Sequence, residues 1–331
     1  MTSRIPHFLR CAAVAALALA STLLSACVSS SPKPPYVASE PPRGWCLFNR
    51  PSEDNAADQW AYVQQLQRDG SLRKAANQAE ALQLFWPTSP EAPRAQLLHA
   101  RLLDARDKHK DAFEAYQLLI EKYPESCDYE AIVADQLRLA NAVCTSRLAT
   151  CWGLLPGFEA PSRAIPLFQA VIDEAPEGPG APEAAYRIAL AQEDDYEYEK
   201  AIDAFYQVVN RFPESPYAVQ AALGQARCHI TLADDAPHDA RAREAAIAAC
   251  DFVLKTYPKQ VRKGPIEADR QRLIDRREAD AYARCLYYDK TIKNFEAARL
   301  EYKSFVALYP NSEHIDAARA RLEQLQAANK E

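Results

Sequence analysis

Apolar residues recur three and four positions apart along most of this chain, which is the spacing of one face of an α-helix. The pattern is divided by six prolines at which helices are predicted to end, and an aromatic residue stands in front of five of them. An alanine lies twelve residues before each proline, an aromatic or small residue lies eight before, and an aliphatic residue or phenylalanine lies five before. The prolines are Pro87, Pro124, Pro176, Pro213, Pro258 and Pro310, and the alanines are Ala75, Ala112, Ala164, Ala201, Ala246 and Ala298.

This register has a physical reason. Positions four and three residues apart share one helical face, so the alanine lets a partner helix approach closely while the larger residues fill the space beside it. Two residues after four of the prolines stands a serine, which predicts that the next helix is capped by Ser89, Ser126, Ser215 or Ser312. The sequence therefore predicts an all-α chain of repeated helical hairpins, closed by a capping helix over residues 312–328.

The arrangement resembles the tetratricopeptide repeat, in which helix A, a tight turn and helix B with a small–aromatic face are followed by a closing proline. The likeness covers residues 54–329 and implies a right-handed superhelix, or α-solenoid, of about six helical hairpins. The spacings between the prolines are 37, 52, 37, 45 and 52 residues, against about 34 for the standard repeat. The two longest intervals predict insertions or extended helices near residues 144–161 and 261–288.

The N-terminal segment is typical of export. Arg4 and Arg10 precede or flank an apolar run of roughly 14 residues, which is short for a membrane span of about 20. The order Leu24-Ser25-Ala26-Cys27 resembles a bacterial lipobox, which implies a cleaved signal peptide over residues 1–26 and covalent diacylglycerol and N-acyl lipid on Cys27, with no other cofactor. Residues 27–53 are rich in proline and serine and predict an extended tether. The alternative is an ordinary secretory signal in which Cys27 is incidental.

Composition and charge exclude several functions. The formal net charge is −6, and removal of Arg4 and Arg10 with the signal would make it −8, so nothing suggests a nucleic-acid partner. The histidines are scattered and no CxxC pair, nucleophile elbow or phosphate loop is present, so we predict no metal site and no catalytic residue. Cys228 and His229 are adjacent, but neighbouring helical residues point about 100° apart and cannot act on each other. The chain is therefore predicted not to be an enzyme.

Seven cysteines remain beyond Cys27, and their odd number leaves at least one unpaired within a monomer. No spacing dictates a disulfide, so the pairing stays open. Most occupy apolar helical positions and are predicted to be small buried hydrophobic residues. They are Cys46, Cys127, Cys144, Cys151, Cys228, Cys250 and Cys285.

Two surfaces are candidate binding sites. In tetratricopeptide solenoids helix A lines the concave face, and counting back from each proline in the family's register places on it Trp60, Arg94, Leu97, Arg101, Tyr186 and Leu190. An aromatic and arginine lining suits a short peptide or an extended segment of a partner. The alternative is that Trp60 and Leu97 only pack against a neighbouring helix or the N-terminal segment.

The second surface is predicted from the segment Lys255 to Arg277, which contains eight basic and three acidic residues and so has a local net charge of +5. Such asymmetry on an acidic protein predicts contact with an acidic partner or anionic lipid headgroups. The alternative is a solvated helix with local ion pairs. The residues proposed to make the contact are Arg262, Lys263, Arg270, Arg276 and Arg277.

The lipobox, the tether and the Tyr-Pro or Phe-Pro helix endings together resemble the BamD (ComL) lipoprotein family, most closely from Gln65 to Pro124. The resemblance implies anchorage on the periplasmic face of the outer membrane and a part in assembling β-barrel proteins. It implies as partners an Omp85-type barrel protein, other assembly lipoproteins, and unfolded outer-membrane protein segments that enter the N-terminal groove. Other envelope tetratricopeptide adaptors, which serve division, peptidoglycan coordination, secretion or polysaccharide export, share these elements and are the alternative.

Overall fold

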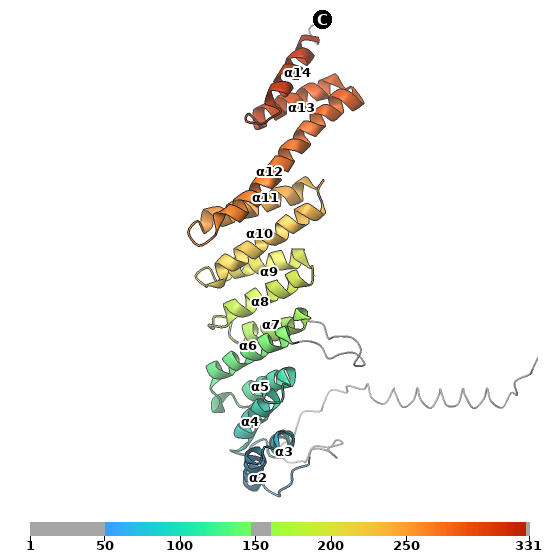
Figure 1. The fold of residues 1–331 in the computed structure, drawn as a ribbon. Helices are drawn as coiled ribbons and strands as arrows, with labels where there is room; N and C mark the ends of the chain where they lie inside the picture. The colour runs from blue at the N-terminus through green and yellow to red at the C-terminus, as the bar shows by residue number, and fades with distance from the viewer. Residues whose placement is uncertain (1–49, 147–159, 329–331) are drawn as a thin grey trace, which may run out of the picture.

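The computed structural model describes residues 50–146 and 160–328, and every regular element within these ranges is helical. The helices are stacked in one elongated row and form six hairpins, α2/α3 to α12/α13, with α14 at the end (Figure 1). This confirms the all-α tetratricopeptide solenoid. The α-helices are α2 (Ala56–Arg68), α3 (Leu72–Phe85), α4 (Ala92–Asp104), α5 (His109–Lys122), α6 (Tyr129–Thr145), α7 (Ile165–Glu174), α8 (Ala181–Asp194), α9 (Tyr198–Arg211), α10 (Tyr217–Asp235), α11 (Ala240–Thr256), α12 (Lys263–Leu286), α13 (Phe295–Leu308) and α14 (Ile315–Ala328). Short elements are η1 (Pro124–Ser126), η3 (Pro161–Ala164) and the π-helical η4 (Tyr287–Ile292).

The six prolines end helices as predicted. Helices α3, α5, α7, α9, α11 and α13 each stop two residues before their proline. The residue between has φ from −134° to −121° and ψ from 47° to 73° in all six cases. This uniform geometry follows from the proline ring, which excludes the helical conformation from the residue before it.

The predicted serine caps are wrong at Ser89, Ser126 and Ser215, whereas the Ser312 Oγ accepts from the His314 N–H at 3.1 Å just before α14. The backbone N–H groups of all four serines donate to the carbonyl oxygen of the residue before the proline, at 3.0–3.2 Å. Each serine thus closes the turn, and the following helix begins later. Further side-chain caps come from other residues, which are Asn55 at α2, Asp128 at α6, Asp239 at α11 and Asn294 at α13.

The core is distributed along the row rather than gathered at one centre. All six repeat alanines are completely buried, and the residues four positions later, such as Phe168 and Phe205, are buried as well. Ala164 differs from the others because it lies in η3, immediately before α7. Helices pack mainly on their neighbours in sequence, which is the nearest-neighbour arrangement of repeat proteins.

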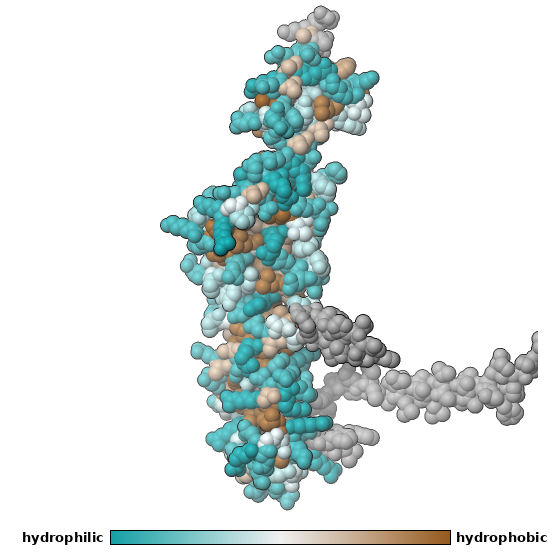
Figure 2. Space-filling view, in the orientation of Figure 1, coloured by the Kyte–Doolittle hydropathy of each residue, from teal (hydrophilic) through white to brown (hydrophobic). Residues whose placement is uncertain are grey.

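The long interval near residues 261–288 is an extended helix, since α12 runs through most of it. The C-terminal end of α12 shares a separate apolar cluster with α13 and α14, which includes Cys285, Tyr302 and Leu325. Figure 2 shows the molecule narrowing at the middle of α12, between this C-terminal module and the rest. Most of the other interval, 144–161, lies outside the described residues.

The signal peptide, most of the tether, and the lipobox residues Leu24, Ser25, Ala26 and Cys27 also lie outside the described residues. Among the residues that the structure does describe, no helix has both the length and the apolar character to cross a membrane.

Candidate functional site

The six predicted groove residues lie on A helices, in two groups that are separated along the row. Trp60 is on α2, Arg94, Leu97 and Arg101 are on α4, and Tyr186 and Leu190 are on α8, with α5, α6 and α7 between the two groups. The apolar members are half-buried against the core, as the alternative expected for Trp60 and Leu97. The two arginines are exposed.

Tyr186 is an example of a predicted groove residue whose ring packs against other aromatic rings. Its ring centroid lies 5.9 Å from that of Phe205 and 5.4 Å from that of Tyr217. Burial raises the pKa of the Tyr186 phenol. Tyr186 therefore contributes to packing between hairpins, and the exposed part of the predicted groove is centred on Arg94 and Arg101.

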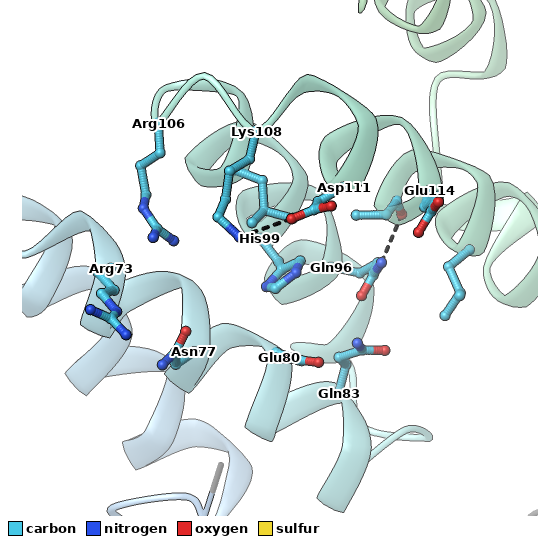
Figure 3. Close-up of a pocket in the computed structure, with 13 residues that line it drawn as sticks. Arg73, Asn77, Glu80, Gln83, Gln96, His99, Arg106, Lys108, Asp111 and Glu114 are labelled. Atoms are coloured by element: carbon cyan, nitrogen blue, oxygen red, sulfur yellow. Dashed lines mark hydrogen bonds and ion pairs between the residues drawn. The ribbon is translucent and has the colours of Figure 1, made fainter. Parts of the chain in front are cut away.

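A cavity of about 490 Å³ opens between α3, α4 and α5, on the side of α4 opposite to Arg94 and Arg101 (Figure 3). Gln96, His99 and Leu103 line it, about half a helical turn away from the face that carries Arg94 and Arg101. None of the six predicted groove residues contributes to its lining. Sequence analysis missed this cavity, which we call the α3–α5 pocket.

The floor of the α3–α5 pocket consists of side chains held in fixed orientations. The Gln96 Nε2 donates to the carbonyl oxygen of Ala115 at 2.7 Å, which fixes the amide because a carbonyl can only accept. His99 Nδ1 likewise donates to the carbonyl oxygen of Ala76 at 2.8 Å. Gln96 is 1% exposed and Gln83 is 6% exposed. Neither Oε1 has a hydrogen-bond partner in the described part of the chain.

The rim of the pocket is electrically asymmetric. Arg73 and Arg106 lie at one end and Gln83 and Glu114 at the other, as Figure 3 shows. Neither of these two arginines forms an ion pair with another described residue, whereas the nearby Lys108 pairs with Asp111 at 2.9 Å. The pocket therefore has a cationic end and an end rich in acceptors.

One signal in the sequence points to this pocket. A glutamine stands 28 residues before the closing proline in each of the first two repeats, at Gln59 before Pro87 and at Gln96 before Pro124. In both repeats this amide is buried between apolar neighbours on helix A. A buried polar residue that recurs in register requires a hydrogen-bonded role.

The structure also changes the interpretation of the predicted basic surface. Arg276 pairs with Asp234 at 3.0 Å, Arg277 pairs with Glu244 at 3.0 Å, and Arg270 pairs with Asp251. These ion pairs join α12 to α10 and α11, and the acidic partners neutralise much of the positive charge that was expected on this surface. Arg262 and Lys263 are exposed at the start of α12 and remain available for a partner.

Three of the described cysteines are unsuited to nucleophilic chemistry because they are buried. Cys228, Cys250 and Cys285 are completely buried free thiols, and burial raises their pKa values to about 12, 11 and 11. Burial also lowers the pKa of His229. Cys127, which follows η1, and Cys144, in α6, are half-buried against the core, whereas Cys46 and Cys151 lie outside the described residues. No group of three metal-binding side chains occurs within the described ranges.

A solenoid of helical hairpins that closes each repeat with proline defines a class of interaction scaffolds. The chain's sequence agrees with this class, because the tetratricopeptide repeat family matches residues 94–126 and 183–215, which cover α4/α5 and α8/α9. These two repeats are thus of the tetratricopeptide type, which supports a scaffold for protein–protein interaction, and domains of this kind bind peptides or protein partners. Such repeat proteins are typically not enzymes.

Solved structures with similar folds come from several systems. A MamA fragment from Desulfovibrio magneticus RS-1 is 16% identical and has a TM-score of 0.31, covering 63% of this chain and 99% of its own. PilW, a widely conserved type IV pilus biogenesis factor, is 12% identical with a TM-score of 0.30, covering 80% and 99%. A tetratricopeptide repeat protein from Parabacteroides merdae ATCC 43184 is 14% identical with a TM-score of 0.32, covering 82% and 98%. No curated protein matches the sequence.

Proposed function

We propose that this chain is a lipid-anchored scaffold on the periplasmic face of the outer membrane that takes part in the assembly and insertion of β-barrel outer-membrane proteins. It acts by binding, without catalysis. The observation that carries the proposal is the lipobox order Leu24-Ser25-Ala26-Cys27 ahead of a tetratricopeptide solenoid. The exposed Arg94 and Arg101 beside the half-buried Leu97 support it, because they offer charged and apolar contacts to an extended segment.

The test is a mild-detergent pull-down of the native-level protein from its own cell envelope, with the partners identified by mass spectrometry. Stoichiometric recovery of an Omp85-type barrel protein is expected. Cys27→Ala is the control for anchoring, and it should lose both lipid incorporation and recovery in the membrane fraction. Recovery of division, peptidoglycan, secretion or polysaccharide-export proteins instead would refute the assembly role and leave the adaptor alternative.

Charge reversal at the start of α12 is expected to weaken the proposed partner contact. The double variant Arg262→Glu, Lys263→Glu should lower affinity for the Omp85-type partner by roughly tenfold and reduce its salt dependence, because both side chains are exposed cations. Binding is measured by titration at two salt concentrations. Arg270, Arg276 and Arg277 are left intact, since their ion pairs hold α12 in place.

The double variant Lys303→Glu, Arg319→Glu, an equal charge change at exposed positions of α13 and α14, is the matched control and should bind as the wild type does. Equal losses in both variants would show that net charge, and not this surface, determines the affinity.

A further inference from the structure

Gln59 in the first repeat corresponds to Gln96 in the second, and its side-chain oxygen is bonded to the backbone of residues 52 and 53. Gln59 is completely buried, and its Oε1 accepts from the backbone N–H groups of Ser52 and Glu53, both at 3.0 Å. The neighbouring Gln78 accepts from the Ser52 N–H at 3.1 Å and donates to the Arg50 carbonyl oxygen at 3.1 Å. Two glutamine side chains thus hold the main chain of the non-helical segment 50–53.

Gln96 is built into the second repeat in the same way. Gln59 Nε2 donates to the carbonyl oxygen of Gln78, at 3.1 Å, and Gln96 Nε2 donates to that of Ala115, at 2.7 Å. Both acceptors lie 19 residues further on, in the B helix of the same hairpin. The two sites differ at Oε1, which receives two backbone N–H groups in Gln59 and none in Gln96.

An unpartnered buried acceptor costs on the order of 1–3 kcal/mol, so a molecule that brings a donor to the Gln96 oxygen would stabilise the pocket. Gln83 supplies a second such oxygen in the same pocket. A polypeptide offers an N–H group at nearly every residue, and the first repeat shows this chain using glutamine to hold exactly that kind of group. The volume of about 490 Å³ lies within the usual range of ligand pockets, about 300–1,000 Å³.

We propose that the α3–α5 pocket binds a non-helical segment of a partner protein through the segment's backbone N–H groups, which donate to Gln96 and Gln83, while an acidic side chain of the segment pairs with Arg73 or Arg106. This second binding site faces away from Arg94 and Arg101. It does not depend on barrel assembly, because it rests only on the α3–α5 pocket and on the hydrogen bonds of Gln59 in the first repeat.

The probe is the acetylated and amidated tetrapeptide Arg-Pro-Ser-Glu, which has the sequence of the segment held in the first repeat and carries one carboxylate. It is titrated into the full chain in mild detergent while the side-chain amide NMR signals of Gln83 and Gln96 are followed. Saturable shifts in the millimolar range are expected. A peptide N-methylated at serine and glutamate keeps both side chains but loses their N–H groups, and it should bind about tenfold more weakly.

Gln83→Met is the informative variant, because it removes the acceptor, retains the size of the side chain and breaks no hydrogen bond between described residues. It should weaken binding of the tetrapeptide about tenfold without lowering the thermal stability of the chain. Gln65→Met, at an exposed position of α2, is the matched control and should bind normally. Absence of shifts at millimolar peptide would overturn the proposal, since water alone would then complete the pocket. Equal binding of the N-methylated peptide would overturn it as well, by leaving only charge attraction.

Discussion

Phe205→Ala is expected to lower the free energy of unfolding by about 3–5 kcal/mol, because it empties a fully buried position between α9 and α10. The ring fits against Gly224 so closely that a Cβ added there would lie 2.5 Å from its Cζ atom. Neighbouring backbone cannot collapse into the space without moving both helices. Urea unfolding followed by circular dichroism measures the loss.

The next residue provides a matched control. Tyr206 lies on the same helix and is of similar size, but it is 54% exposed, so Tyr206→Ala should cost less than about 1 kcal/mol. Similar costs for the two variants would contradict the register, in which the residue eight before the proline is a core position and its neighbour is not. The comparison therefore tests the repeat pattern itself.

Asp289→Asn is expected to destabilise the C-terminal module by on the order of 3 kcal/mol, since it removes one partner from a buried ion pair. The Asp289 side chain is completely buried in η4 and accepts from Arg321 of α14 at 2.7 and 2.9 Å and from the Tyr302 hydroxyl at 3.3 Å. Amide hydrogen exchange should show α14 opening more readily in the variant. Exchange in α4, which makes no contact with this module, should not change.

The pH dependence of this pair has a defined sign. Hydrogen bonds from Arg321 hold the pKa of Asp289 below its ordinary value of 3.8. The folded state therefore favours the carboxylate, and the stabilisation is fully present above pH 3.8 and is lost as the pH falls through the lowered pKa. The difference between wild type and Asp289→Asn should accordingly shrink in acid.

Asp316→Asn makes the same chemical change at an exposed position in the first turn of α14. It should cost no more than about 1 kcal/mol, through weaker interaction with the helix dipole. A wild-type exchange profile for Asp289→Asn would show that the buried ion pair does not hold α14 to the module.

Much of the architecture could be predicted from the sequence, because it depends on local rules. The proline at position 213 ends α9 through its own ring, and Ala201 and Phe205 share a face because four residues make about one helical turn. Three of the four serine caps were mispredicted because a serine after a proline can either cap a helix or close a turn, and the two outcomes look alike in the sequence.

The binding surfaces and the α3–α5 pocket were less predictable from the sequence, because they depend on contacts between helices that are far apart in the chain. A positive run such as Arg270–Arg277 looks like a free basic surface until the fold places Asp234, Glu244 and Asp251 opposite it. Likewise, Gln96 shows in the sequence as a polar residue at an apolar helical position, in register with Gln59. Whether its oxygen meets backbone N–H groups, as that of Gln59 does, is decided by which segment lies across the helix.

The sequence by itself determined the helices, their ends and the small–aromatic face by which they pack, since each of these follows from residues within one or two turns of one another. Only the tertiary structure decided which charges neutralise one another, which apolar side chains of the predicted groove are covered, and where the α3–α5 pocket remains open. The reason is that these features join residues 19 to 43 positions apart, whose distance is set by the stacking of whole hairpins and not by any local preference.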